Sequence, residues 1–336
     1  MIRINPIYAR DGDRLYREFF EQQFRTHRLG APGNWHGGAA QKLSLTEPVQ
    51  VDAFSSLLRG LTPEGEALVG RQPQRADRAA AWRITLTDAG PASVVLWALS
   101  PSVYRLRIRR AHTHAVRTVI TDFESGLNGR PWFDNPDAPG RKSALFAEFQ
   151  AGATRHQAPR LHTNLFLFNL LFQKGAKTRT FAPEEVKQQW LRMDAVYTRT
   201  LGKELSRILG HQVQIPAELS VRFDAHPLNG SPDPDRRVAP QRLENRGLFA
   251  AWQQQARGWG WGPERVADLI AKSRSSQSWS NWNQDCRKLV RSWAVWLKTP
   301  THSPQRVWQG MLRGAEQDTS RPTQQQSHSH SHGMSH

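Results

Sequence analysis

Residues 149–164 read Phe-Gln-Ala-Gly-Ala-Thr-Arg-His-Gln-Ala-Pro-Arg-Leu-His-Thr-Asn, and an almost continuous apolar run follows them as far as residue 172. Such a run predicts a buried strand over 161–172. A second strand is predicted over 144–150, directly before this segment. Arg155 lies between the two strands and Arg160 beside the second one. Both are candidate contacts for the phosphates of a nucleic acid, because guanidinium groups pair with phosphate.

The flanking sequence alternates between helical and strand-like patterns. Apolar residues at three-to-four spacing predict helices over the first thirty residues, over 51–61 and over 103–124. Residues 82–87 alternate like a strand, and 93–99 fit either a helix or a strand. A further helix is predicted from Pro183 to about Leu209, with acidic residues in its first turn, where the helix dipole favours them.

The composition changes after residue 230. Residues 230–240 are rich in Pro and Asp, so we place a soft domain boundary there. Of the 13 tryptophans, eight follow residue 250 and are interleaved with Arg and Lys: Trp252, Trp259, Trp261, Trp279, Trp282, Trp293, Trp296 and Trp308. The chain is therefore divided into a core (1–229), a helical Trp- and Arg-rich subdomain (230–315) and a Ser/His-rich tail expected to be disordered (316–336).

Aromatic rings beside cations suit single-stranded nucleic acid, because bases stack on the rings while the cations follow the phosphates. Trp259 and Trp261 are flanked by glycines, so we expect both rings to be exposed. Trp293 and Trp296 are interpreted instead as core positions of an amphipathic helix. DNA contacts in this region are expected from Arg257, Trp259, Trp261 and Arg265.

The charge of the chain indicates its class of partner. Lys and Arg number 46 against 29 Asp and Glu, a formal net charge of +17. Dispersed arginines favour nucleic acid over a membrane surface, with a merely basic, soluble surface as the alternative. Neither a run of about eighteen apolar residues nor a secretory signal is readable. The single Cys286 leaves no internal disulfide or Cys-based zinc site, so a cytoplasmic protein is expected.

Segment 149–164 resembles the signature of the MobF-type conjugative relaxases. That signature reads approximately Phe-x-His-x-Thr-Ser-Arg-x-x-Asp-Pro-x-Leu-His-Thr-His, followed by four apolar residues and Asn, and this chain matches its spacing without a gap. The resemblance covers roughly residues 10–310 and is weakest after 225. Supporting similarities lie at 34–37 (Asn-Trp-His-Gly), 61–65 (Leu-Thr-Pro-Glu-Gly), 111–116 (Ala-His-Thr-His-Ala-Val) and 194–197 (Asp-Ala-Val-Tyr).

The resemblance implies an α+β fold of the HUH relaxase type, with a central antiparallel β-sheet, flanking helices and a mostly helical C-terminal extension. In that family, three histidines hold a divalent metal that polarises one phosphate of single-stranded DNA. A tyrosine near the N-terminus attacks that phosphate, and an aspartate on a neighbouring strand orients the metal site. Attack on a phosphodiester needs such a cation and a nucleophile held in line.

The positions of this chain that match the metal site are depleted. Ala151 stands at the first histidine, His162 retains the second, and Asn164 replaces the third. Thr85 stands at the aspartate. We therefore expect no cofactor, with a residual divalent metal at His162 as the alternative. His156 could approach such a metal, although a loop histidine is more often solvated.

The matching nucleophile positions are also changed. The tyrosine pair of the family falls on Phe19 and Phe20, and a second pair falls near Phe24. A phenyl ring has no oxygen with which to attack phosphorus. Tyr8 and Tyr16 could substitute, and Tyr16 is the fallback nucleophile. Because catalytic residues act as a unit, their joint replacement indicates that the chemistry was lost as a unit.

The leading interpretation is a catalytically impaired, relaxase-like accessory protein of conjugative plasmid transfer that binds single-stranded or hairpin DNA. One alternative is an active relaxase that nicks single-stranded DNA with Tyr16 as its nucleophile. Another is a component that docks on a relaxosome or secretion system, with DNA contact incidental. The expected partners are DNA and, in addition, an active relaxase or a type IV secretion component, with no membrane.

Overall fold

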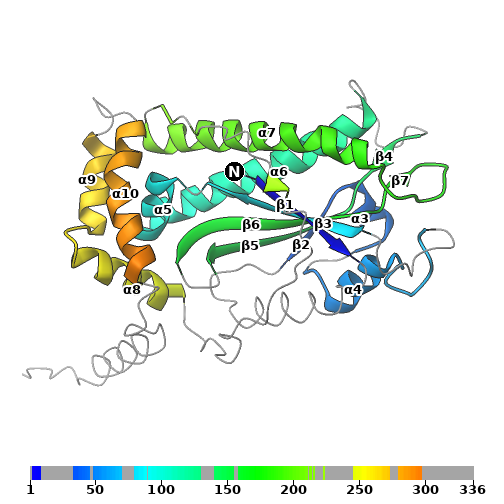
Figure 1. The fold of residues 1–336 in the computed structure, drawn as a ribbon, viewed down its shortest axis with the longest axis horizontal. Helices are drawn as coiled ribbons and strands as arrows, with labels where there is room; N and C mark the ends of the chain where they lie inside the picture. The colour runs from blue at the N-terminus through cyan, green and yellow to red at the C-terminus, as the bar shows by residue number, and fades with distance from the viewer. Residues whose placement is uncertain are drawn as a thin grey trace, which may run out of the picture.

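The computed structural model describes residues 2–8, 33–45, 48–69, 79–88, 90–129, 140–154, 158–210, 212–213, 215, 222–223, 245–272 and 279–296. Within these ranges the fold is built around a six-stranded sheet that runs through the centre of the molecule (Figure 1). Two long helices, α6 and α7, extend along one side of this sheet. Three further helices, α8, α9 and α10, gather at one end of it.

The strands are β1 (Ile2–Tyr8), β2 (Asn34–His36), β3 (Ala79–Thr87), β4 (Lys142–Ser143), β5 (Phe146–Ala153), β6 (Pro159–Phe168), β7 (Phe172–Gln173) and β8 (Arg222–Phe223). The helices are α3 (Gly38–Lys42), α4 (Val51–Arg59), α5 (Pro91–Leu99), α6 (Ser102–Asn128), α7 (Pro183–Leu209), α8 (Asn245–Arg257), α9 (Pro263–Lys272) and α10 (Trp279–Trp296).

The strand order of the main sheet is β2-β5-β6-β3-β1-β8. The pairs β2/β5, β5/β6, β6/β3 and β3/β1 are antiparallel, and the short β8 pairs with β1 in parallel at the edge. The predicted α+β fold with a central antiparallel sheet and flanking helices is therefore confirmed. The strands predicted over 144–150 and 161–172 are β5 and β6, although β6 ends at Phe168 and not at residue 172. The two are neighbours, and β6 lies in the interior of the sheet between β5 and β3.

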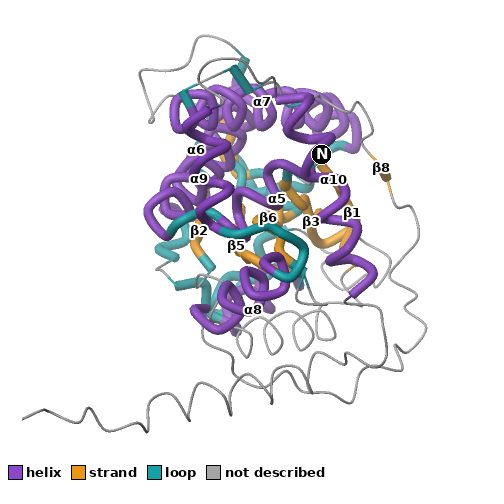
Figure 2. Tube along the Cα trace, turned by 90° about the vertical axis from the view of Figure 1, so that its left-hand side faces the viewer, coloured by secondary structure: helices purple, strands orange, loops and turns teal. Residues whose placement is uncertain are grey.

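Two buried clusters lie on opposite faces of the sheet. The larger joins alternate strand residues, such as Ile84 and Leu165, to the inner sides of α5, α6 and α7. The smaller lies on the other face, where Phe54 of α4 meets Phe166 and Phe168 edge-to-face with ring centroids 5.2 and 5.3 Å apart. Figure 2, turned by 90°, shows the strands as a layer with α6 and α7 to one side.

Several predicted elements are confirmed because their local signals agree with the packing. The helix predicted from Pro183 is α7, which begins at that proline and ends at Gly210 in the left-handed region (φ 73°). The helices predicted over 51–61 and 103–124 are α4 and α6. Residues 93–99, which fitted either element, lie in helix α5.

The prediction of a helix over the first thirty residues is wrong for residues 2–8. These residues form β1, and Ile2 and Ile4 enter the larger buried cluster. Helical spacing was inferred from residues after Asp11, whereas the opening Ile-Arg-Ile alternates with the period of a strand. The rest of that predicted helix, 9–30, lies outside the described residues.

The C-terminal helices share the larger core with the sheet. Helices α10 and α8 pack against α5, and Trp252, Trp282 and Trp293 are buried in the common cluster. The interpretation of Trp293 as a core position is therefore confirmed, while the side chain of Trp296 lies outside the described residues. Across the described ranges, no helix is both long and apolar enough to cross a membrane.

Candidate nucleic-acid interface

The register of β3, β5 and β6 brings together the four positions that align with the metal site in the family resemblance. Thr85 pairs with Asn164 across β3 and β6, and Ala151 pairs with His162 across β5 and β6. Directly opposed residues share a face, and alternate residues of one strand share a face too. These four side chains therefore belong to one side of the sheet, which we call the motif face. Thr87, opposite His162 on β3, belongs to it as well.

At the centre of the motif face, the side chains of Thr85 and Asn164 are hydrogen-bonded to each other. The Thr85 hydroxyl donates a hydrogen bond to Oδ1 of Asn164 over 2.9 Å. Asn164 is buried, so this bond satisfies an amide oxygen that would otherwise be costly to bury. At these two positions, where the family resemblance implies a carboxylate and a metal-binding imidazole, this chain has a neutral pair whose members bond to each other.

His162 retains an imidazole at the second ligand position. Its Nδ1 lies 3.1 Å from the carbonyl oxygen of Arg160, which places the ring proton on Nδ1. Burial lowers the pKa of His162 below its usual value, and the charges of Arg160 and Arg83 lower it further, against the raising effect of the backbone hydrogen bond. The ring is therefore neutral at pH 7.

The residues of the motif face do not fit a divalent metal. Ala151 offers no ligand atom, and the amide oxygen of Asn164 is already bonded to Thr85. Zinc and similar ions are held by three or four protein ligands, whereas this set supplies one imidazole. Among the described residues, no three His, Cys, Asp or Glu side chains are grouped so as to hold a metal.

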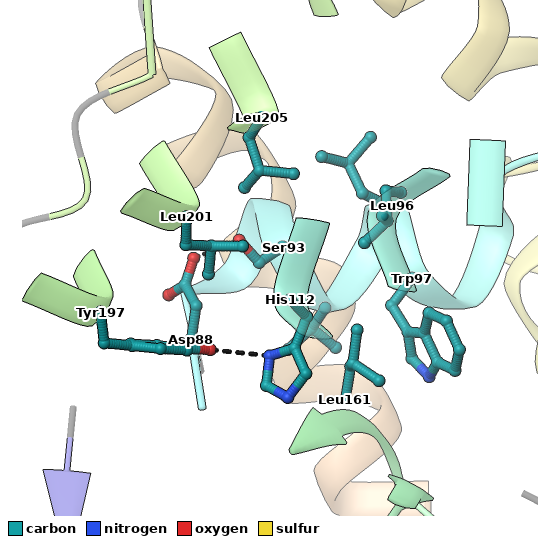
Figure 3. Close-up of a pocket in the computed structure, with 11 residues that line it drawn as sticks. Asp88, Ser93, Leu96, Trp97, His112, Leu161, Tyr197, Leu201 and Leu205 are labelled. Atoms are coloured by element: carbon teal, nitrogen blue, oxygen red, sulfur yellow. Dashed lines mark hydrogen bonds between the residues drawn. The ribbon is translucent and has the colours of Figure 1, made fainter. Parts of the chain in front are cut away.

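On the opposite face of the sheet, β6 is hydrogen-bonded to α6, and α6 is hydrogen-bonded to α7. Thr163 points to the side covered by α6 and α7, where its hydroxyl lies 2.8 Å from Nε2 of His112. Nδ1 of the same ring lies 2.8 Å from the Tyr197 hydroxyl, as Figure 3 shows. All three residues are buried, and burial lowers the pKa of His112 to about 3. This neutral chain of hydrogen bonds ties β6 to α6 and, through His112, to α7.

The start of α5 lies beside this chain. Asp88 accepts hydrogen bonds from the Ser93 hydroxyl and from the backbone N–H of Gly90, an arrangement that holds the first turn of the helix. Together with His112 and Tyr197, the side chains of Asp88 and Ser93 line a small pocket whose remaining walls are apolar (Figure 3). Trp97 at the other end of α5 donates from Nε1 to the carbonyl of Gly152 over 2.7 Å. This bond supports the backbone next to Ala151.

In the C-terminal helices, the two glycine-flanked tryptophans differ. Trp259 is 36% exposed, as expected, but the expectation of an exposed Trp261 is wrong, since that ring is 9% exposed. Gly260 adopts a positive φ of 76°, and the turn lets the Trp261 N–H bond to the carbonyl of Ala256. The Trp261 ring is thereby directed into the core, and the Arg265 guanidinium lies 4.4 Å from its centroid.

The other predicted contacts are placed as follows. Arg257 lies on the exposed end of α8, with its guanidinium 3.8 Å from Glu264. Arg160 is half-buried on β6 and donates from Nε toward the Thr87 hydroxyl at 3.5 Å. The remaining predicted positions lie outside the described residues: Tyr16, Phe19, Phe20, Phe24, Arg155 and His156.

Comparison with known proteins gives a consistent result. The family model for the TrwC relaxase matches residues 10–225. Two curated relatives, both named multifunctional conjugation protein TraI, are from Escherichia coli and from its strain K12. The first is 29% identical over 160 residues, 47% of this chain and 9% of the relative, and the second is 27% identical over 198 residues, 56% of this chain and 11% of the relative. The chain thus spans about a tenth of the length of these relatives.

Solved structures agree in fold. The metal-bound complex of the conjugative relaxase TrwC with oriT DNA has a TM-score of 0.51 at 20% identity, covering 88% of this chain and 99% of that one. The metal-free complex has a TM-score of 0.50 at 18% identity, covering 87% and 98%. These likenesses show the relaxase fold. Because the family model spans well over half of the sequence, the chain belongs to the TrwC relaxase family.

Proposed function

We propose that this chain is a DNA-binding accessory protein of conjugative transfer that binds single-stranded or hairpin DNA without cleaving it. The observation that carries the proposal is the Thr85–Asn164 hydrogen bond. It occupies the two positions at which the family resemblance implies a carboxylate and a metal-binding histidine. A site that had merely lost one ligand would leave the others poised, whereas here two replaced residues satisfy each other.

DNA is the proposed partner for two reasons. The solved relaxases that share the fold are complexes with oriT DNA. The formal charge of +17 also favours a polyanion. We place the protein in the cytoplasm, beside an active relaxase or a type IV secretion component that carries out the chemistry. Residues 1–229 are proposed as the relaxase-like core and 230–315 as a helical subdomain that clamps the strand.

The stacking contact in that subdomain is assigned to Trp259. Its indole is the exposed member of the pair, and Arg257 lies two residues before it on the exposed end of α8. Base stacking on such a ring contributes about 1–3 kcal/mol and adds no phosphate contact. The buried Trp261 serves the core instead, with Arg265 covering its ring.

Binding is tested by titrating the protein with a labelled single-stranded oligonucleotide at several salt concentrations. Affinity should fall steeply with salt, with a log–log slope of roughly −3.5 if about five phosphates of a single strand are contacted. Trp259→Ala should weaken binding with the slope unchanged, while Arg257→Gln should weaken binding and make the slope flatter by about 0.7 units, the share of one single-strand phosphate. Absence of binding at low salt would favour the protein-docking alternative.

Cleavage is tested by incubating the protein with single-stranded DNA and Mn²⁺ and resolving covalent protein–DNA adducts on a denaturing gel. No adduct is expected, because Phe19 and Phe20 lack a hydroxyl and the motif face offers one imidazole. An adduct that forms with the wild type and disappears in Tyr16→Phe would establish the active-relaxase alternative.

A further inference from the structure

Helix α6 lies along one side of the sheet (Figure 1), and its outward side carries one continuous stripe of exposed side chains. The inward side supplies buried residues such as Ile108 and Ala115 to the larger core. The exposed residues recur every three or four positions, which places them in line along the helix. We call this stripe the α6 outer face, and it consists of Val103, Leu106, Arg107, Arg110, His114 and Arg117.

The α6 outer face begins with two aliphatic side chains. Val103 is 60% exposed and Leu106 is 49% exposed. Across the described ranges, the large hydrophobic side chains that are exposed are these two and Trp259. Residues three positions apart on a helix are neighbours, so Val103 and Leu106 form one small apolar patch. Covering such a patch with a partner is favourable, because it removes apolar surface from water.

The rest of the α6 outer face is cationic. The sequence has no Asp or Glu between Asp88 and Asp122, so the helix supplies no carboxylate along this stretch. In the part of the chain that the structure describes, no carboxylate lies within ion-pair distance of Arg107, Arg110 or Arg117. Like charges three or four positions apart on a helix repel each other, and carboxylates from a partner would reverse the sign of that interaction.

The arginines of α7 show the difference. Arg192 lies 2.6 Å from Asp122, and Arg207 lies 2.9 Å from Glu204 on its own helix. These two side chains find their carboxylates within the protein. The arginines of the α6 outer face have no such neighbour among the described residues, so their counter-charges have to come from solvent or from a partner.

The combination of charge and apolar surface selects the class of partner. A nucleic acid backbone pairs with arginine but offers no apolar surface to an aliphatic side chain. A helix at a membrane surface keeps its cations and its apolar residues on opposite faces, whereas here they share one face. A second copy of the chain is disfavoured, because each copy carries a formal charge of +17. An acidic protein segment with an apolar end complements both parts of the stripe.

The length of the stripe gives the length of that segment. At about 1.5 Å per residue, the helix from Val103 to Arg117 spans about 21 Å. A helical segment of about fourteen residues would match this distance, and an extended segment would need about six or seven.

We propose that the α6 outer face is a docking surface for an acidic segment of another protein. Apolar side chains of that segment pack on Val103 and Leu106, and its carboxylates pair with Arg107, Arg110 and Arg117. The inference adds a protein partner to the proposed DNA-binding function and does not depend on it, because the DNA contacts were assigned to other residues.

The probe is a labelled synthetic helical peptide of about sixteen residues, with leucines in its first two turns and glutamates on the same face of the following turns. Its binding to the full-length chain is measured by fluorescence anisotropy at several salt concentrations. The wild type should bind the peptide, and the affinity should fall as salt screens the ion pairs.

Two double variants separate the two parts of the surface. Val103→Ser/Leu106→Ser should lower the affinity about tenfold without changing its salt dependence. Arg110→Gln/Arg117→Gln should lower the affinity about three- to tenfold at low salt and make it less sensitive to salt. All four positions are exposed, and circular dichroism melts verify that each variant folds.

The matched control is Arg199→Gln/Lys203→Gln, which removes the same charge from exposed positions on α7. It should leave the affinity for the peptide nearly unchanged. A second peptide, with serines in place of the leucines, should bind more weakly and should not distinguish the wild type from Val103→Ser/Leu106→Ser.

Failure of the wild type to bind the leucine-containing peptide at low salt would overturn the proposal. Equal losses in Arg110→Gln/Arg117→Gln and in the control would overturn it too, because the attraction would then be a general effect of net charge. A wild-type dimer in sedimentation experiments that dissociates in Val103→Ser/Leu106→Ser would mean that a second copy covers the surface instead.

The same variants are titrated with an oligothymidylate and with vesicles that contain anionic phospholipid. A loss of oligothymidylate binding in Arg110→Gln/Arg117→Gln beyond that of the control would make the stripe a nucleic-acid surface and overturn the proposal. Vesicle binding that disappears in Val103→Ser/Leu106→Ser would make it a membrane surface, with the same consequence. If the wild type binds the peptide but not the oligothymidylate, the docking surface stands and the proposed DNA-binding function fails.

Discussion

The two faces of strand β6 differ in the hydrogen bonds that their side chains make. On the helix-covered side, Thr163 is joined to His112 and Tyr197 in a buried, fully paired chain of hydrogen bonds. On the motif face one residue away, Asn164 is paired with Thr85 at positions where the family resemblance implies metal-site residues. The same strand therefore carries a buried structural hydrogen-bond chain on one face and a neutral Thr–Asn pair on the other.

The difference follows from the period of a β-strand. Successive side chains point to opposite faces, so a residue that fixes the strand and a residue that performs chemistry can be neighbours in sequence and independent in space. Loss of His112 would leave the buried hydroxyls of Thr163 and Tyr197 without their shared partner. On the motif face, Thr85 and Asn164 satisfy each other and need no metal ion as a partner.

The largest effect is expected on the helix-covered side. His112→Ala leaves the buried hydroxyls of Tyr197 and Thr163 without their shared partner and opens a cavity, so it should lower the free energy of unfolding by about 3 kcal/mol. Urea denaturation measures the change. His114→Ala, at an exposed position on the same helix, is the control and should cost less than 0.5 kcal/mol. An equal loss of stability in His112→Ala and His114→Ala would show that the buried hydrogen-bond chain behind β6 does not stabilise the fold more than an exposed position does.

Acid should destabilise the protein through the same residue. His112 is held neutral in the folded state with a pKa of about 3, and in the unfolded chain its pKa is about 6.5. The unfolded state therefore binds more protons between these values, so stability falls as the pH drops below about 6.5. The loss attributable to His112 should reach about 2–3 kcal/mol at pH 4.5.

His112→Gln isolates this contribution, because glutamine does not titrate. Denaturation curves at pH 6.5, 5.5 and 4.5 should show a shallower pH dependence for His112→Gln than for the wild type, so the stability difference between the two narrows in acid. A parallel pH dependence would show that His112 is not held neutral by its surroundings.

The smallest stability effect is expected on the motif face. Thr85→Val removes the donor to Asn164 and keeps the shape of the side chain, so it should cost about 1 kcal/mol. The amide of Asn164 can turn toward other donors or toward water at this face. A loss above about 3 kcal/mol, measured by the same denaturation method, would mean that the Thr85–Asn164 pair is as structural as the chain behind it.

Helices and strands could be predicted from the sequence where the local sequence signals agreed with the tertiary packing. Helix α7 was predictable from Pro183 and the acidic first turn, and β6 from its apolar run. Strand β1 was missed because its alternation is short and stronger helical signals follow it. The burial of Trp261 depends on the positive φ of Gly260, which flanking glycines permit but do not specify.

The sequence was enough to predict which residues belong to the candidate site, but it was not enough to predict the hydrogen bonds between them. Ala151, His162 and Asn164 could be aligned from spacing alone, but the Thr85–Asn164 hydrogen bond requires the register of two strands 79 residues apart in sequence. His112 and Tyr197 stood in segments that resembled the family, and their buried partners emerged only from the packing of two helices on the sheet.

The most direct test of the account is metal binding at His162. Isothermal calorimetry compares the full-length wild type with His162→Ala, so that the histidines of the C-terminal tail contribute equally to both. The account predicts identical titrations with zinc, nickel and manganese, since a single imidazole without further protein ligands holds no ion tightly. The ligand-restoring variant Ala151→His/Asn164→His/Thr85→Asp should gain a binding step. A submicromolar site in the wild type that disappears in His162→Ala would contradict the account.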